Sequence, residues 1–297
     1  MDPGTGGGLE VAVTKDRSSA PTPVVNGPTK HSKIWPLEFY RSAVGKKWVM
    51  AITGLIGVGF VVTHMIGNLK VYMGADDLNH YGEFLRELLY PLVPRTATLW
   101  IMRFALIGAV LLHLHAAYSL TVMNHRARPT DYAGGRDYVA ASFASRTMRW
   151  SGIIVGAFIV FHLLDLTGGQ TNPDFVRGDP YNNLVASFER PAVAAFYVIA
   201  NVLLGIHLFH GVWSMFQSLG INSPRFNVWR LRIAQLIALA IVIGNVSFPL
   251  AVTFGIVEAE PEERVKVCVE REELVSSGAC RDAADEVGIE TAVEEDD

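Results

Sequence analysis

The sequence predicts an all-α integral membrane protein built from five transmembrane helices. Half of its 297 residues are hydrophobic and 18% are charged, whereas about a quarter of the residues in an average soluble domain are charged. The apolar residues gather into long runs, each with enough length for the ~20 residues that a helix needs to cross a bilayer. The first four runs also contain histidine, a polar residue that is costly at that depth and usually has a specific partner there. The five predicted spans cover residues 48–73, 98–124, 148–167, 192–221 and 231–257.

The segments outside the spans differ in composition. Residues 1–33 are rich in Gly, Pro, Ser and Thr and contain no secretory h-region, so we expect a disordered N-terminal extension. Residues 34–47 mix aromatic and cationic side chains, as in a helix that lies on the membrane surface, and residues 76–94 are expected to form a short amphipathic helix. The membrane domain is therefore expected to cover residues 34–257, followed by an acidic soluble tail at 258–297.

The distribution of lysine and arginine predicts the orientation of the chain. Both residues are concentrated before the first span, between the second and third, and before the fifth, while in the two other loops they are few and offset by acids. The N-terminus is therefore expected in the cytoplasm. Five spans then place the acidic tail on the non-cytoplasmic side, where Cys268 and Cys280 can form a disulfide. The absence of CxxC or Cys/His zinc spacing argues against an iron–sulfur cluster or zinc finger in this chain, and we expect no nucleic-acid partner.

The histidines of the spans fall at two depths. Counted at ~1.5 Å per residue from the entrance of each span, His64 and His162 lie about 24 and 18 Å from the cytoplasmic side. His115 and His207 lie about 24 and 22 Å from the opposite side. The odd-numbered spans therefore supply an outer pair and the even-numbered spans an inner pair.

Two imidazoles at one depth that face each other across a bundle are the ligand set of a b-type haem. The outer pair would be His64 with His162, and the inner pair His115 with His207, so the five helices are expected to surround two stacked haems. Depth alone does not separate His115 from His113, which lies about 200° away round the same helix, so that only one of the two can face a haem. A single histidine in a span can equally hydrogen-bond a neighbouring helix, and it is the fourfold pattern that favours haem.

Several other residues in and near the spans each allow two interpretations. His210 lies on the same face as His207 and is expected either to contact a propionate or a quinone or to form an ordinary hydrogen bond. Asp165, one turn after His162, is a candidate proton carrier for quinone or a helix-end residue at the interface. Gly54, Gly57 and Gly59 allow the close approach of a helix or of a flat ring. Two further histidines are expected in loops: His80 and His125.

Four motifs carry a family resemblance: THMIGN around His64, LHAAYS around His115, FIVFHLLD around His162 and IHLFHGVWSMFQSLGI around His207. Through them, residues 35–257 resemble the single-polypeptide, five-helix, dihaem cytochrome b subunit of succinate:menaquinone oxidoreductases and fumarate reductases (complex II). The most specific feature is HGVWS, which begins three residues after the ligand in this family. The axial haem ligands of the family fall on His64, His115, His162 and His207, and the choice of His115 over His113 rests on this resemblance.

The resemblance implies the membrane anchor of a succinate dehydrogenase, a subunit that shares in quinone reduction while the flavin lies in another subunit. Its expected cofactors are two b haems, its substrate is menaquinone, and its partners are a flavoprotein and an iron–sulfur subunit on the cytoplasmic face. The expected location is the cytoplasmic (inner) membrane, as a multi-pass protein, and a higher oligomer of the complex is compatible with the sequence.

Two features bear on the quinone chemistry that the resemblance implies. In the fumarate reductase branch a glutamate of the first outer loop serves the quinone, and the candidates here are Glu87 and Glu83. The acidic residue that precedes the ligand of the fourth span, associated there with transmembrane proton transfer, is replaced by Gly205. This replacement argues against the proton-compensated mechanism.

Two rival functions stay open at this point. The first is the haem b anchor of another respiratory oxidoreductase, such as a nitrate reductase or a formate dehydrogenase, against which the four histidines on successive spans and HGVWS argue. The second is a membrane transporter whose histidines relay protons. A transporter of that kind has no haem, so a reduced-minus-oxidised spectrum distinguishes it.

Overall fold

The structure is a computed structural model that describes residues 35–127, 143–221, 223–271 and 277–289. All regular secondary structure in these ranges is helical, and five of the helices are long and apolar enough to cross a membrane. The prediction of an all-α, five-span, multi-pass membrane protein is therefore confirmed. The predicted disordered extension at residues 1–33 lies outside the described residues, as does part of the basic loop, residues 128–142.

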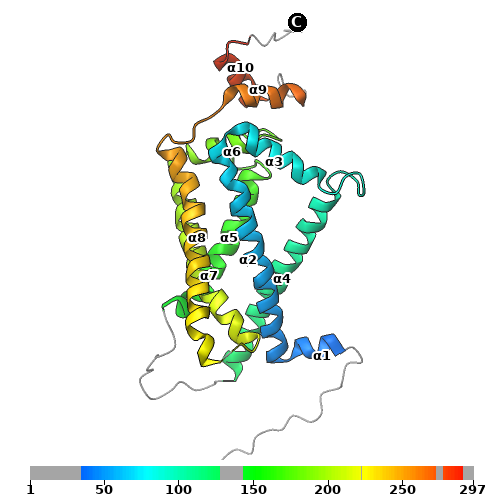
Figure 1. The fold of residues 1–297 in the computed structure, drawn as a ribbon, viewed down its shortest axis with the longest axis vertical. Helices are drawn as coiled ribbons and strands as arrows, with labels where there is room; N and C mark the ends of the chain where they lie inside the picture. The colour runs from blue at the N-terminus through cyan, green and yellow to red at the C-terminus, as the bar shows by residue number, and fades with distance from the viewer. Residues whose placement is uncertain (1–34, 128–142, 222, 272–276, 290–297) are drawn as a thin grey trace, which may run out of the picture. The chain divides into compact units, whose positions relative to one another are not determined.

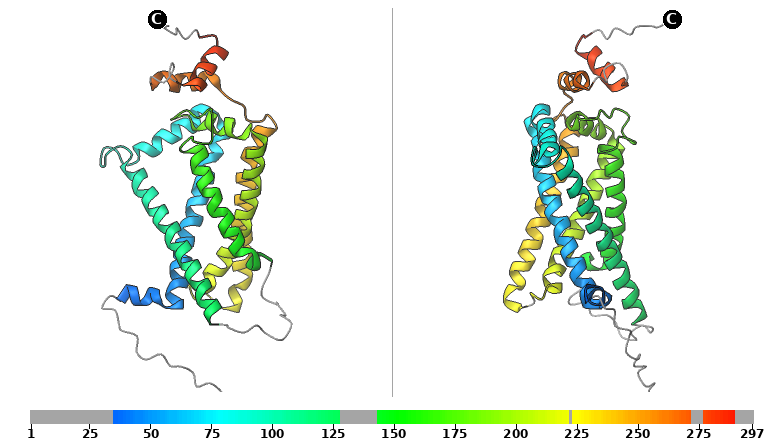
Figure 2. Two further views of the ribbon diagram at one scale, coloured as in Figure 1. Left: turned by 180° about the vertical axis from the view of Figure 1, so that it is seen from behind. Right: turned by 90° about the vertical axis from the view of Figure 1, so that its right-hand side faces the viewer.

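The five long helices alternate in direction (Figures 1 and 2). They are α2 (Ala43–Asn68), α4 (Ala97–Arg126), α5 (Phe143–Leu166), α7 (Pro191–Ser218) and α8 (Asn227–Thr253). Helix α2 continues as the 3-10 helix η1 (Leu69–Met73). Compared with the predicted spans, α2 and α5 begin earlier and α8 is shifted towards the N-terminus, because backbone hydrogen bonding continues past the ends of an apolar run into polar sequence.

Local sequence signals account for two helix starts. Ser42 is the N-cap of α2, and its side-chain oxygen accepts a hydrogen bond from the backbone of the first turn. Lys46 donates to the carbonyls of Tyr40 and Arg41, at 3.2 and 3.0 Å, so the ammonium group is satisfied and α2 can begin before its apolar run. Pro191 occupies the first turn of α7, where its missing N–H costs no intrahelical hydrogen bond.

The chain divides into two compact units, residues 1–38 and 39–297. The predicted surface segment at residues 34–47 is not one helix. It consists of α1 (Trp35–Arg41), which begins in the first unit, and of the start of α2, with Ser42 between them.

Helix α7 makes the most extensive contacts among the spans, because it packs against α2, α5 and α8, whereas α4 packs mainly against α2. Leu204 and Leu208 of α7 meet Ile241 of α8 in a buried cluster. Gly205 lies within this contact, where a Cβ atom would come within 2.2 Å of Cγ2 of Val242. A glycine at position 205 therefore allows the close packing of α7 on α8.

Four short helices gather where α2, α5 and α8 end, and we call this the capped end of the bundle (Figure 1). They are α3 (Ala75–Glu87), α6 (Pro180–Phe188), α9 (Pro261–Glu270) and α10 (Gly278–Glu286). We call the opposite end, which has the short 3-10 helix η2 (Pro224–Phe226), the open end. The predicted acidic tail thus contains two helices, and the predicted amphipathic helix ends at Glu87, seven residues before its expected limit at residue 94.

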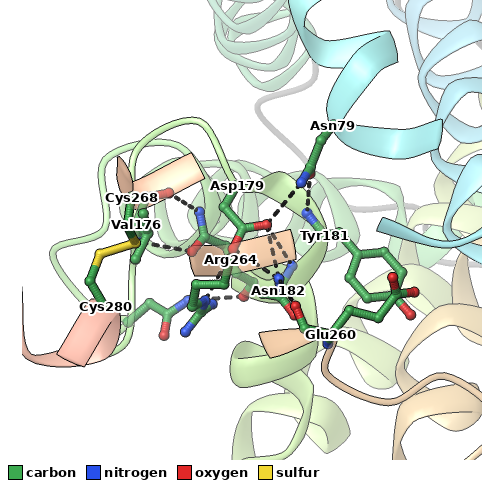
Figure 3. Close-up of polar contacts among 11 residues, drawn as sticks. Asn79, Val176, Asp179, Tyr181, Asn182, Glu260, Arg264, Cys268 and Cys280 are labelled. Atoms are coloured by element: carbon green, nitrogen blue, oxygen red, sulfur yellow. Dashed lines mark hydrogen bonds and ion pairs between the residues drawn. A yellow bond between two sulfur atoms is a disulfide. The ribbon is translucent and has the colours of Figure 1, made fainter. Parts of the chain in front are cut away.

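A buried ion pair links α6 to α9 at the capped end (Figure 3). The carboxylate of Asp179, which is 0% exposed, accepts a hydrogen bond from Nε of Arg264 at 3.0 Å. Asp179 is also the N-cap of α6, accepting from the backbone N–H of Asn182, and it accepts from the side-chain amide of Asn79 on α3. One carboxylate therefore joins three of the four helices of the capped end.

Two further contacts complete this end of the bundle. A disulfide between Cys268 and Cys280 joins α9 to α10, so the predicted pairing is present. The hydroxyl of Tyr181 donates to the carbonyl of Glu258 at 2.9 Å. Burial, together with the nearby carboxylates of Glu260 and Glu258, raises the pKa of Tyr181 to about 12, so its hydroxyl stays a donor at physiological pH.

Candidate metal centre

The structure brings the predicted outer pair of histidines together. His64 of α2 and His162 of α5 have ring centroids 5.9 Å apart, with their planes at 84°. With metal–imidazole bonds of about 2 Å, two imidazoles on opposite sides of one metal ion have their centres about 6 Å apart. The separation of these two rings therefore suits axial ligands of one ion.

Aromatic rings and polar side chains surround this pair. Phe60 stacks on His64 at a centroid separation of 5.2 Å, and Phe158 is tilted against His162 at 5.8 Å. The side-chain amide of Asn68 lies 3.3 Å from Nε2 of His64. Each ring therefore packs against a phenylalanine, although His64 and Phe60 are themselves exposed in the chain alone.

Asp165 does not contact the imidazole pair directly. Its carboxylate is 0% exposed and forms an ion pair with Arg190 at 2.6 Å. It also accepts a hydrogen bond from the hydroxyl of Tyr197 at 3.0 Å, and this hydroxyl lies 3.4 Å from Nδ1 of His162. The candidate proton carrier of the sequence analysis therefore reaches the histidine only through a tyrosine.

The rings of His113 on α4 and His207 on α7 have matching surroundings. Nδ1 of His113 lies 3.2 Å from Oγ1 of Thr53 and 3.1 Å from a backbone carbonyl of α2. Nδ1 of His207 lies 3.2 Å from Oγ of Ser151 on α5. In both cases Nδ1 points at a neighbouring helix, and no hydrogen bond to Nε2 is present among the described residues.

A glycine follows each of these hydroxyl residues and makes room for the ring. A Cβ atom built on Gly54 would lie 3.4 Å from Cε1 of His113, and one on Gly152 would lie 3.4 Å from Cε1 of His207. The sequence pairs Thr-Gly in the first span and Ser-Gly in the third therefore form the same cradle twice. This repeated pair is the signal that could have identified His113 from sequence.

The structure places His115 elsewhere. Its side chain is exposed and stacks on Tyr40 at a centroid separation of 5.7 Å, with the hydroxyl 2.5 Å from Nδ1. His113, two residues earlier on α4, instead lies beside Thr53 of α2. His115 therefore does not occupy the Thr53–Gly54 cradle that holds His113, because a step of two residues turns the side chain about 200° round α4. The pairing of His115 with His207 stays a prediction.

The remaining predicted residues lie at the ends of the bundle. Glu83 and Glu87 of α3 belong to a surface network, in which Arg95 contacts Glu83 at 2.8 Å and Glu87 at 3.3 Å. Arg86 and Arg271 also contact Glu83. His80 is exposed on α3, and His125 lies in the last turn of α4 rather than in a loop. Among the described residues, the ion-pair partners of the two glutamates are arginines and not imidazoles.

The outer pair offers two imidazoles, the number of axial ligands that a b-type haem takes from a protein. Among the described residues no group of three or more His, Cys, Asp or Glu side chains could hold a metal ion, whereas zinc takes three or four protein ligands. A porphyrin brings four equatorial nitrogens and needs only two axial ligands, which opposed histidines can supply. The helices that carry these histidines, α2 with α5 and α4 with α7, are not among the extensively packed pairs.

Two glycines leave further space between the levels of the two pairs. A Cβ atom on Gly57 of α2 or on Gly156 of α5 would meet no neighbouring atom within 4 Å. In sequence, Gly57 lies between Gly54 and His64, and Gly156 lies between Gly152 and His162. The structure therefore has open space on both helices at the height between the two imidazole pairs.

No protein-family model matches the chain, and comparisons with curated proteins and with solved structures found no significant similarity.

Proposed function

We propose that this chain is the dihaem cytochrome b anchor of a succinate:quinone oxidoreductase of the menaquinone-using type. The observations that support the proposal are the outer pair, His64 and His162, with ring centroids 5.9 Å apart, and the matching cradles around His113 and His207. His64 and His162 form the pair nearer the capped end. His113 and His207 form the pair nearer the open end, with His113 in place of the His115 that the family resemblance selects.

In this proposal the neighbouring residues fix the orientation of the imidazoles. Thr53 and Ser151 bind Nδ1 of His113 and His207, so Nε2 of each ring is directed towards the haem. Such hydrogen bonds set the tautomer and orientation of metal-ligating histidines. A b haem supplies one-electron iron chemistry when bound, and two stacked haems provide a path for electrons across the membrane. The glycine cradles keep the rings at a fixed height.

The charges of the chain support docking of the cytoplasmic subunits at the open end. The described cations of this end include Lys47, Arg126, Arg225 and Arg232. We place the flavoprotein and the iron–sulfur subunit on this face, and the quinone near the pair of the capped end. This arrangement agrees with the positive-inside rule for a protein of the cytoplasmic membrane.

A dithionite-reduced minus oxidised spectrum of the purified protein tests the haem assignment. We expect an α-band of b-type haem and two haems per chain. A protein without this band would exclude the proposed function and leave a His-relay transporter as the alternative. Co-purification with its partners, assayed with succinate and a quinone analogue, separates a succinate dehydrogenase anchor from the anchor of another respiratory complex.

Substitution of the two neighbouring histidines of α4 tests the ligand assignment. His113→Ala should lose the inner haem and keep the outer one, as should His207→Ala, because each removes one of two axial ligands. His115→Ala is the matched control and should keep two haems per chain, measured by the pyridine haemochrome. Loss of the inner haem in His115→Ala with retention in His113→Ala would instead restore the assignment that the resemblance implies.

A further inference from the structure

Tyr197 of α7 connects the outer imidazole pair to a buried carboxylate. Its hydroxyl donates to Oδ2 of Asp165 at 3.0 Å and lies 3.4 Å from Nδ1 of His162. The tyrosine is 3% exposed, and its ring contacts Phe158 and His162 edge-on or at a steep angle. The phenol is therefore fixed in position by packing as well as by its hydrogen bond.

The contacts of Asp165 determine which way the phenol proton points. Arg190 binds Oδ1 of the carboxylate at 2.6 Å, Thr171 donates to the same oxygen at 3.2 Å, and Ser187 donates to Oδ2. A carboxylate next to a guanidinium is an acceptor only. The hydroxyl proton of Tyr197 is therefore donated to Asp165. The phenol oxygen of Tyr197 can then accept a hydrogen bond from Nδ1–H of His162.

This environment differs from that of the inner pair. The Nδ1 atoms of His113 and His207 face uncharged groups, the hydroxyls of Thr53 and Ser151 and, for His113, the backbone carbonyl of Met50 at 3.1 Å. Nδ1 of His162 faces a phenol that is polarised by a buried anion. When the ring nitrogen that does not bind the metal donates a hydrogen bond, the imidazole becomes a more basic ligand. A more basic axial ligand favours the oxidised iron. The two haem sites are therefore unequal in their hydrogen bonding.

We propose that Tyr197 is a positioning residue that lowers the reduction potential of the outer haem by accepting the Nδ1 proton of His162 while bonded to Asp165. This inference rests on the proposed function, since it requires a haem ligated by His162. Arg190 binds Oδ1 of Asp165, whereas Tyr197 binds Oδ2. The guanidinium therefore holds the carboxylate in place without occupying the oxygen that Tyr197 uses.

Redox titration of the purified complex containing Tyr197→Phe tests the inference. This variant keeps the aromatic ring and removes only the hydroxyl, while Asp165 retains its bonds to Arg190, Thr171 and Ser187. We expect the midpoint potential of the outer haem to shift upward, with the inner haem unchanged and two haems per chain. The outer haem is identified as the one that is lost in His64→Ala.

Tyr72→Phe is the matched control. The hydroxyl of Tyr72 donates to Ser247 at 2.7 Å in the same half of the bundle, and its loss should leave both potentials unchanged. Asp165→Asn gives a second variant, in which the phenol remains but the charge is lost, and it should shift the outer haem in the same direction.

Three results would overturn the proposal. An unmoved outer potential in Tyr197→Phe would show that the phenol does not act on the ligand, and loss of the outer haem in this variant would show that it only holds the site together. A shift of the same size in Tyr72→Phe would show a general effect of removing a hydroxyl. If the unsubstituted complex has no b-type spectrum, it is the proposed function that fails.

Discussion

Asp179 is the buried charge on which the capped end depends most. It is 0% exposed and is the acceptor for donors from α3, α6 and α9. Its ion partner Arg264 is 9% exposed and has a buried Nη2 atom without a hydrogen-bond partner among the described residues. The pair is therefore incompletely satisfied, and the loss of either member leaves a charge in a region that excludes water.

Replacing Arg264 with Met should destabilise the capped end by about 3–5 kcal/mol. The aliphatic volume is roughly kept, but the carboxylate of Asp179 loses its countercharge. Hydrogen exchange of the α6 and α9 amides measures this effect, and adding Asp179→Asn should recover much of the protection. Lys266→Met is the control: its ammonium pairs with Glu263 at the surface, and protection should not change. Equal protection in Arg264→Met and the native protein would contradict the expectation.

The contact between α7 and α8 depends on a glycine that an acidic side chain could not replace. A Cβ atom at position 205 would lie 2.2 Å from Cγ2 of Val242 and 3.7 Å from the carbonyl of Ala238. The first neighbour is the end of a side chain that can move, and the second is ordinary contact with the backbone. The obstacle to a larger residue is therefore mainly one valine.

Gly205→Ala should destabilise the bundle by about 1–3 kcal/mol, as overpacking of a core does. Val242→Ala in the same chain should remove the clash, so that the double variant is more stable than the sum of the single effects predicts. Unfolding in mixed detergent micelles measures the free energies. Gly108→Ala on α4 is the control, because its Cβ would meet nothing within 4 Å and the change should be small. Additive effects at positions 205 and 242 would refute this account of the contact.

The number of spans and their apolar runs were predictable from sequence, because both depend on composition along the chain. The short helices α6, α9 and α10 were not predicted, and the pairing of Cys268 with Cys280 was left as a hypothesis. The rotation of each helix was not predictable either. An error of one residue in the start of a span moves the estimated depth by ~1.5 Å but turns the side chain by about 100°. His113 and His115 therefore looked equivalent in depth, and the structure separates them by the Thr53–Gly54 cradle on the neighbouring helix.

Asp165 shows a second limit of sequence reasoning. Its partners Thr171, Ser187, Arg190 and Tyr197 come from the loop after α5, from α6 and from α7. Their spacing has no period that marks a shared site, since the network forms only when three segments meet at the capped end. The Asp was found as a single residue one turn after His162, but its link through Tyr197 required the structure.

Two independent features of the whole chain agree on its orientation. The described cations next to the first, third and fifth spans, among them Lys47, Arg126 and Arg232, belong to the open end, and the disulfide of Cys268 with Cys280 belongs to the capped end. Positive loops remain in the cytoplasm, whereas disulfides persist in oxidising compartments outside it. Both rules predict that the open end is cytoplasmic and that the capped end faces the opposite side.

A membrane-impermeant maleimide tests this orientation in intact spheroplasts. Cys268 and Cys280 should be unreactive without reductant, because they are paired, and should react after mild reduction with an impermeant phosphine. In a chain with both cysteines replaced by serine, Ser223→Cys places one thiol in the short linker before α8 at the open end. This thiol should react only after the cells are opened. The opposite result would be labelling of the linker thiol in closed spheroplasts, together with tail thiols that react only after lysis. It would reverse the orientation and place the proposed cytoplasmic partners at the capped end.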